Sequence, residues 1–312
     1  MKSWALRYSL KHVALAALSF ILSALLAAFG ALLTVKLTAL RENFLRTQLE
    51  NSAYAEKTLE NMRQKFASYG AVSGFSDEFF AETVSLDVIR ADLHREITRL
   101  YSDAGARPFD YGRFKRDFND RLLEEAEKMI SENKAKAAEM ADGADNEGLF
   151  LEITPEDEQA LENLARMTAT VYANAVTMPF SVQINGLIKR VERANSVALA
   201  AVAAFIIVCA IILFLSDVSK NKKLEWLLRA LGGAIFTLVM PSVALSIHLR
   251  FVSVPISNPA LLAFINSCAN SFIIVVWLVT GAFLVVWAFT LAFRITFPGP
   301  DDSRSGLPWH RG

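Results

Sequence analysis

Four long apolar segments and one long polar segment divide the chain. The apolar segments are residues 13–35, 196–216, 230–249 and 271–293. At about 1.5 Å of rise per helical residue, each can cross the roughly 30 Å hydrocarbon core of a bilayer. The polar segment, residues 36–195, separates the first apolar segment from the second. The pattern predicts an all-α polytopic membrane protein with four transmembrane helices and an extracytoplasmic helical bundle inserted between the first two.

The spans differ in regularity. The first has 23 residues without a charge, which exceeds the about 7–15 apolar residues of a secretory signal. Ala27 to Ala31 also fits a signal-peptidase site, so cleavage of the first span stays open. The run from Phe251 to Phe293 has no charge and is too long for one span. We therefore expect an extracytoplasmic loop over residues 250–270, with a turn at Pro259 and a short interfacial or re-entrant segment before the fourth span.

The polar segment has the periodicity of helices. It predicts one helix from residue 36 to 69, continuous with the first span, and others over about 76–102 and 111–141. A fourth begins at Thr154, with Pro155 in its first turn, and breaks near Pro179. Four helices allow an up-down-up-down bundle that returns the chain to the membrane. The residues expected in its core are Leu45, Leu49, Leu59, Met62, Phe66, Leu86, Ile89, Leu93, Ile97, Leu100, Phe114, Phe118, Leu122, Ile130, Leu161, Leu164, Met167, Val171 and Ala175.

A formal net charge of zero hides an uneven distribution of charge. Residues 36–193 carry 21 basic and 28 acidic side chains, whereas the rest of the chain carries 11 basic and 4 acidic ones. Basic residues in short segments mark the cytoplasmic side of a membrane. We therefore expect cytoplasmic tails at residues 1–12 and 294–312, a basic cytoplasmic loop at 217–229, and the polar segment outside. These basic residues are Lys2, Arg7, Lys11, Lys220, Lys222, Lys223, Arg229, Arg294, Arg304 and Arg311.

The chain has few residues suited to chemistry. Its polar segment contains one histidine, His94, for which we expect a solvent-exposed position. It contains no nucleotide-binding fingerprint or CxxC motif, and its acidic stretch from Asp142 to Glu147 lacks the spacing of a calcium loop. We therefore expect no enzyme activity, no cofactor, no metal site and no nucleic-acid partner. Cys209 and Cys268 lie at different expected depths, and no N-glycosylation sequon occurs, which favours a bacterial plasma membrane.

Two features are candidates for protein contacts. Ser19, Ser23, Ala27 and Ala31 recur every four residues along the first span. Such a stripe of small side chains lets two transmembrane helices approach closely, although simple richness in alanine gives the same pattern. The second feature is the basic segment between the second and third spans, which we expect to form a short helix that either only fixes topology or contacts a partner. Its candidate contact residues are Lys220, Lys222, Lys223, Trp226 and Arg229.

The four-span topology and the segment Leu227 to Gly233 resemble the FtsX-like permease family. Members of that family have a large external domain after the first span and a basic helix ahead of the third. The resemblance implies a cytoplasmic ATPase as partner. The size and position of the polar segment also resemble the four-helix ligand domains of bacterial chemoreceptors. Two hypotheses follow: a non-enzymatic sensor or scaffold in the bilayer that signals to a membrane or envelope protein, and a membrane subunit of an ATP-driven complex.

Overall fold

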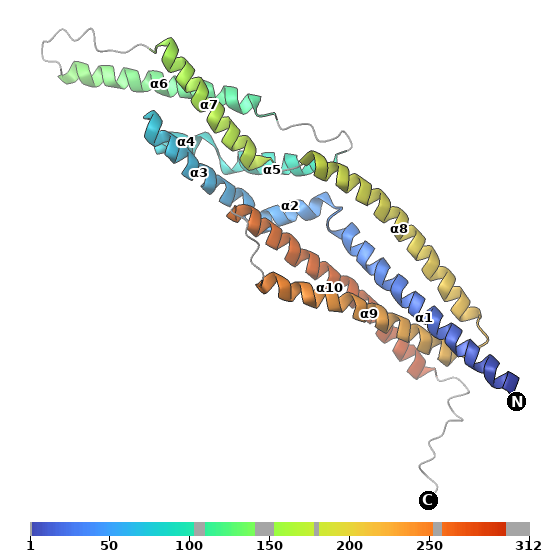
Figure 1. Cartoon of the computed structure of the whole chain (residues 1–312). Helices are drawn as coiled ribbons and strands as arrows, with labels where there is room; N and C mark the ends of the chain where they lie inside the picture. Colours follow the sequence, from blue (N-terminus) through green and yellow to red (C-terminus); the bar gives the residue numbers. More distant parts are fainter. Residues whose placement is uncertain (1, 103–109, 141–152, 178–180, 252–257, 298–312) are drawn as a thin grey trace, which may run out of the picture. The chain divides into compact units, whose positions relative to one another are not determined.

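The structure is a computed structural model that describes residues 2–102, 110–140, 153–177, 181–251 and 258–297. Every regular element within these ranges is a helix (Figure 1). Two compact units are present: unit 1 comprises residues 1–52 and 187–312, and unit 2 comprises residues 53–186. The helices are α1 (Lys2–Leu37), α2 (Glu42–Asn51), α3 (Tyr54–Ser73), α4 (Asp77–Thr83), α5 (Leu86–Tyr101), α6 (Gly112–Met140), α7 (Pro155–Val176), α8 (Ser181–Leu215), α9 (Lys220–Phe251) and α10 (Pro259–Thr296).

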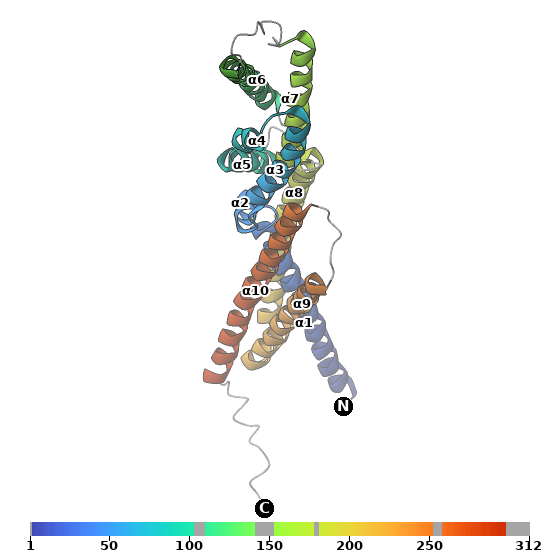
Figure 2. The ribbon, with the colours of Figure 1, turned by 90° about the vertical axis from the view of Figure 1, so that its left-hand side faces the viewer.

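Four helical segments are long and apolar enough to cross a membrane, and they belong to α1, α8, α9 and α10. They are Lys11–Leu37, Gln183–Leu215, Lys220–Ile247 and Pro259–Thr296. The described residues are therefore all-helical, and their four candidate spans fit a multi-pass membrane protein, as the hydrophobic pattern predicts. In unit 1, α9 packs against both α1 and α10 (Figures 1 and 2).

Contacts along these helices give their directions. Ser19 of α1 contacts Trp226 of α9, and further along both helices Gly30 lies against Leu238, so α1 and α9 are parallel. Glu225 near the start of α9 lies 3.7 Å from Arg294 near the end of α10, so these two helices are antiparallel. The start of α1, the link between α8 and α9, and the end of α10 therefore lie at the same end of unit 1.

Two spans differ from the expected boundaries. Residues 260–270, expected as a short interfacial or re-entrant piece, lie in the first part of the single helix α10, which starts at Pro259 behind an Asn258 side-chain cap. The basic segment over residues 217–229, expected as a short helix of its own, is indeed helical from Lys220, but this helix continues directly into the third span. In both places no residue ends the helix at the expected border. Even Pro241 is accommodated inside α9.

The prediction of one helix over residues 36–69 is wrong. After α1 ends at Leu37, α2 and α3 follow as separate helices, and Ala53 between them has a left-handed backbone with φ of 51°. The side-chain oxygen of Gln48 in α2 accepts hydrogen bonds of 2.8 Å from Ser267 and Ser271 of α10. Because α2 packs on α10 it belongs to unit 1, so residues 42–51 lie outside the helical unit to which the sequence assigned them.

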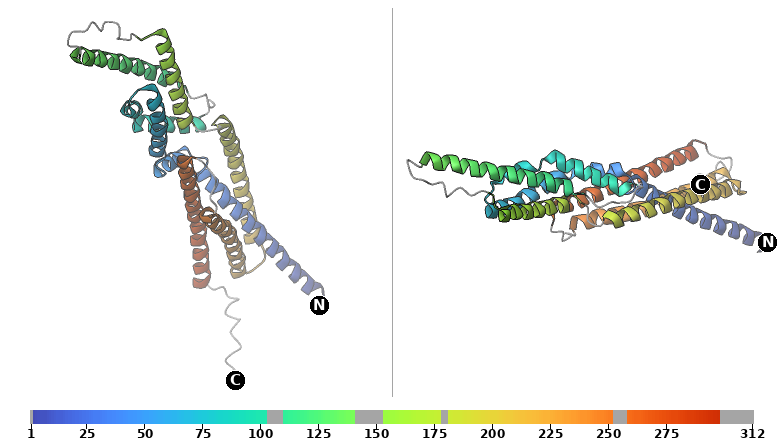
Figure 3. Two further views of the ribbon diagram at one scale, coloured as in Figure 1. Left: turned by 60° about the vertical axis from the view of Figure 1, so that its left-hand side comes forward. Right: turned by 90° about the horizontal axis from the view of Figure 1, so that it is seen from above.

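Unit 2 contains more helices than expected. The helix predicted over residues 76–102 is two helices, because Val84 is extended and Ser85 caps a new helix through the backbone N–H of Val88. The prediction for α6 is confirmed to within two residues. The predicted start of α7 is also confirmed, since Thr154 and Asp157 form a reciprocal capping box. Figure 3 shows α6 in green beside α7 in yellow-green.

The core of unit 2 follows most of the predicted stripes. Those of α3 and α5 are buried apart from the half-buried Leu86, and they include Met62, Phe66, Ile89 and Ile97. For α7 the predicted face is wrong, because Met167 is 50% exposed. The face of α7 that is buried consists of small side chains and one large side chain. Because most of these side chains are small, α3, α5 and α6 can pack closely against α7. The residues of this face are Ala165, Thr168, Ala169, Tyr172, Ala173 and Val176.

Candidate functional site

The most polar part of the interior of unit 2 lies along α5. This helix buries Asp92 and Glu96 on the same face as Ile89, Leu93 and Ile97. Glu96 is only 2% exposed and forms an ion pair with Arg99, one turn further along. A buried carboxylate is costly unless it is paired, so this ion pair fixes the positions of both side chains.

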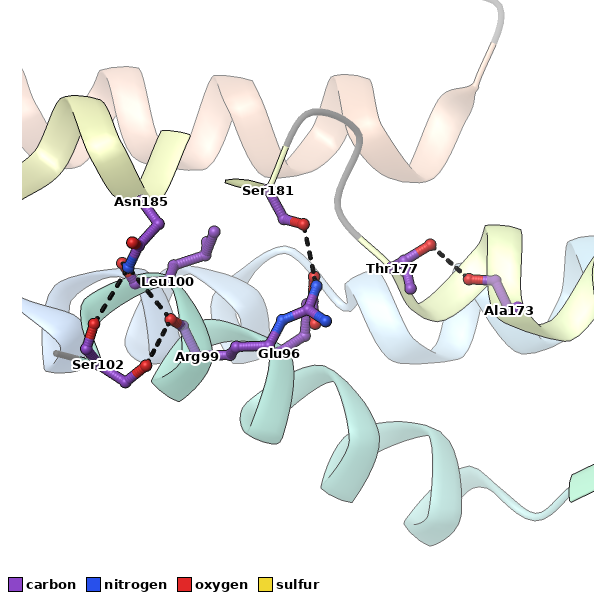
Figure 4. Close-up of polar contacts among 8 residues, drawn as sticks. All are labelled: Glu96, Arg99, Leu100, Ser102, Ala173, Thr177, Ser181 and Asn185. Carbon is purple, nitrogen blue, oxygen red and sulfur yellow. Dashed lines mark hydrogen bonds and ion pairs between the residues drawn. The ribbon is translucent and has the colours of Figure 1, made fainter. Parts of the chain in front are cut away.

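The end of α5 is held by the beginning of α8 (Figure 4). Asn185 is 7% exposed, and its side-chain N–H groups donate to the backbone carbonyl oxygens of Leu100 at 2.7 Å, Ser102 at 3.2 Å and Arg99 at 3.3 Å. The last carbonyls of a helix have no partner inside that helix, so an external donor is what they require. The Asn185 side chain of α8 thus caps the C-terminal end of α5.

A second bond joins the same two helices. The guanidinium group of Arg99 donates to the hydroxyl of Ser181 at 2.9 Å while it pairs with Glu96 (Figure 4). We call the set Glu96, Arg99, Ser181 and Asn185 the α5–α8 clamp. All four residues belong to unit 2. The clamp combines a buried charge pair with a helix cap, and losing either half leaves polar groups without partners.

Tyr172 joins α7 to the other end of this polar face. Its hydroxyl donates to a carboxylate oxygen of Asp92 at 2.6 Å, and the second Asp92 oxygen lies 2.6 Å from Arg95. Its ring stacks on Phe114 with the centroids 4.0 Å apart. Burial, followed by the hydrogen bond to Asp92, raises the pKa of Tyr172 well above its ordinary value of 10.0. The phenol therefore remains a neutral donor at physiological pH.

The small-residue stripe of the first span lies partly against α9. The Ser19 hydroxyl donates to the backbone carbonyl of Trp226 at 2.9 Å. Ser23 lies so close to Gly233 that a methyl group on this glycine would be 2.5 Å from the Ser23 hydroxyl oxygen. Ala27 is buried, but Ala31 is exposed. Close approach in this region thus relies on small residues from both helices, as is typical of helix packing in membranes.

A cavity of about 660 Å³ lies between α1, α9 and α10. Its walls are mainly apolar and include Ala24, Ala28 and Ala31 of the first span. The hydroxyl of Ser242 in its wall already donates to the Leu238 carbonyl. No convergent set of polar groups that would select a ligand is present among the described lining residues.

The five candidate contact residues lie in the first three turns of α9. Lys220, Lys222 and Arg229 are exposed, whereas Lys223 and Trp226 are half-buried. The Lys223 amine donates to the Phe214 carbonyl at 2.5 Å, and thereby caps the end of α8. Three of the five are therefore already engaged inside unit 1, since Arg229 pairs with Glu225 and lies 4.6 Å from the centre of the Trp226 ring.

Sequence reasoning missed the α5–α8 clamp. Its residues are ordinary polar residues of amphipathic helices, and their spacing does not distinguish a buried partner from a solvated one. His94, expected on the surface, is half-buried. Among the described residues, no group of three or more His, Cys, Asp or Glu side chains is placed to hold a metal ion.

Comparison with known proteins gives no match: no family model, curated protein sequence or solved structure is significantly similar to the chain.

Proposed function

We propose that the chain is a non-enzymatic protein of the plasma membrane whose unit 2 lies on the extracytoplasmic side. There it detects a ligand or holds an envelope protein, and it passes the resulting signal to a partner. The α5–α8 clamp is the observation that supports this proposal. Helix α8 begins at Ser181 and continues to Leu215, so the side chain that closes α5 and the second span belong to one helix.

The clamp has the physical properties that a signalling joint requires. Its hydrogen bonds to Leu100, Ser102 and Arg99 come from one amide group, so they form or break together. A ligand shifts such an equilibrium only as far as it binds one state more tightly than the other. A ligand of unit 2 that favours the closed or the open arrangement of α5 would therefore change the restraint on the start of α8.

The orientation can be tested independently of the signal. A reporter that is active only outside the cytoplasm, inserted at Gly143, should be active, and a cytoplasmic reporter at the same position should be silent. The basis is the concentration of basic residues in the tails and in the segment 217–229. The reverse result would place unit 2 in the cytoplasm and refute the extracytoplasmic part of the proposal.

The transmission step requires a probe in the second span. We would replace Cys209 by Ala and Cys268 by Ser, place one cysteine at the exposed position Val197, and measure its labelling rate by a water-soluble maleimide in native membranes. Asn185→Ala should change this rate several-fold because it opens the clamp. Asn174→Ala, an exposed asparagine of α7, is the matched control and should leave the rate unchanged. Equal rates in all three proteins would refute transmission through the clamp.

The alternative, an ATP-driven complex, is favoured by one observation, the exposure of Lys220 and Lys222 at the start of α9. Affinity purification of the tagged chain in mild detergent separates the two functions. A stoichiometric ATPase among the bound proteins would support the alternative. An envelope protein without an ATPase would support the sensor or scaffold.

A further inference from the structure

Lys220 and Lys222 form an exposed, positively charged surface of unit 1 at the start of α9. Among the residues that the structure describes, neither lysine has an ion-pair or hydrogen-bond partner, and both are exposed. The neighbouring Lys223, in contrast, donates a hydrogen bond to the backbone carbonyl of Phe214. No group within the described residues thus competes with an external anion for these two lysines.

Nearby acidic groups do not neutralise them. The Glu225 carboxylate is shared by two cations, Arg229 and Arg294. Apart from Glu225, the stretch from Ser216 to Arg229 has one acidic residue, Asp217, against four basic residues. The first turn of α9 also has no acidic residue, although the positive end of a helix dipole favours one. Across residues 216–229, positive charge is therefore in local excess.

The position of Lys220 and Lys222 relative to the spans indicates which kind of molecule supplies the anion. Only residues 216–219 connect α8 to α9, and both helices carry a membrane span, so this link lies at one membrane surface. Phe214 and Leu215, just before the link, are exposed apolar residues that suit the hydrocarbon boundary. Half-buried Trp226 is a residue type that is enriched at membrane interfaces. Lys220 and Lys222 are therefore at the level of the lipid headgroups.

We propose that Lys220 and Lys222 bind the phosphate of an anionic phospholipid, of the phosphatidylglycerol type, at the α8–α9 end of unit 1. Each lysine near an anionic membrane surface contributes about 1 kcal/mol, so the pair corresponds to about a 30-fold preference over a zwitterionic lipid. The proposal is independent of the function above and of which side of the membrane this end faces.

The test uses the full chain purified in detergent with equal amounts of phosphatidylglycerol and phosphatidylcholine, and counts bound lipids by native mass spectrometry. The wild type should retain phosphatidylglycerol preferentially, and Lys220→Gln/Lys222→Gln should lose most of that preference. The matched control, Lys220→Arg/Lys222→Arg, keeps the charge and should keep the preference. Basic residues elsewhere, such as Lys36 and Arg193 at the other end of the spans, are present in every variant, so they do not affect the difference.

Several results would overturn the proposal. The first is a wild type without lipid preference, and the second is a glutamine variant that keeps the full preference. The third is an unchanged lipid ratio together with loss of a co-purifying protein, which would assign the lysines to a protein partner. If the glutamine variant fails to insert, a salt titration of the wild type decides, because the preference must fall as salt screens the charges. Addition of inorganic phosphate should not displace the lipid; displacement would make the site one for free phosphate.

Discussion

Unit 1 and unit 2 are both helical, but they are packed by different means. In unit 1 the closest helix contacts involve glycine and serine, as at Gly30 and at Ser23 against Gly233. In unit 2 the contacts involve rings, with Phe118 within 6.2 Å of Phe79, Phe80 and Phe114 between ring centroids. In an 18-residue apolar stretch of each candidate span, only 11–33% is buried inside the chain. Many large apolar side chains of unit 1 are therefore left uncovered by protein, whereas most of those in unit 2 pack against one another.

The difference follows from the solvent around each unit. In water, burying a large apolar side chain is favourable, so unit 2 gains stability from Phe and Tyr. In lipid that driving force between helices is absent, and stability comes from close backbone approach and from interhelical hydrogen bonds. The bond from Ser19 to Trp226 and those from Ser267 and Ser271 to Gln48 are of this kind.

The largest effect is expected from removing a ring in unit 2. Phe118→Ala should lower the free energy of unfolding by about 3–5 kcal/mol, because Phe118 is 1% exposed and its loss leaves a cavity. The measurement is urea denaturation of residues 53–186 expressed alone, followed by circular dichroism. This fragment should be soluble and helical, and Met167→Ala should change its stability by less than about 0.5 kcal/mol. An unfolded fragment, or equal effects of the two substitutions, would contradict an independent aromatic core.

A smaller effect should follow from removing one hydroxyl. Tyr172→Phe keeps the ring on Phe114 but removes the hydrogen bond to Asp92. Bonds to charged groups contribute about 1.5–3 kcal/mol, so the same urea titration should show a loss of that size. Thr170, whose hydroxyl bonds its own helix on the exposed side of α7, gives the control Thr170→Val. No loss in the Tyr172 variant would mean that Asp92 finds another donor.

In unit 1 the sensitive position should be a glycine. Gly30→Ala places a methyl group 2.8 Å from the Leu238 side chain and 2.9 Å from the Phe283 ring, so these side chains of α9 and α10 must shift. Overpacking of this kind costs about 1–3 kcal/mol, measured as a lower thermal midpoint of the full chain in detergent. Gly281→Ala is the matched control because nothing lies within 4 Å of the new methyl group. A midpoint that is unchanged in both variants would show that α1 does not depend on small residues.

The smallest effect should appear at high pH. The pKa of Tyr172 is raised in the folded state by burial, whereas an unfolded tyrosine titrates near 10. The stability gained from the neutral phenol is thus complete below pH 10 and lost above it, at up to about 1.4 kcal/mol per pH unit. Burial also raises the pKa of Tyr54, so the wild-type slope contains both tyrosines. The stability difference between wild type and Tyr172→Phe should therefore shrink as the pH rises above 10, and a constant difference would contradict the assignment.

Membrane-protein class and helix type were predictable because they depend on local pattern. The spans are recognised by length and hydrophobicity alone. The start of α7 at Thr154 and Pro155 is likewise a local matter of capping. The stripe from Ile89 to Leu100 was correct because leucine and isoleucine at helical spacing have no competing role.

The predictions that failed concern features that depend on contacts between distant parts of the chain. Residues 38–41, where the helix breaks, contain no proline or glycine from which the break could be predicted. We attribute the break to the packing of α2 on α10, which includes the hydrogen bonds of Gln48. The face of α7 was wrong because size, and not hydrophobicity, selects alanines where helices come close. The α5–α8 clamp was missed because Asn185 and Glu96 have the same sequence signature whether they are solvated or buried.

The sequence by itself thus determined four membrane spans, a helical insert and the position of its charges, because hydropathy and helical period are properties of consecutive residues. Only the tertiary structure decided that residues 42–51 belong with the spans and that Asn185 closes α5. It alone also showed that Lys220 and Lys222 have no partner within the described residues. These are properties of pairs of side chains far apart in sequence, and their energies depend on burial and distance, which no local pattern contains.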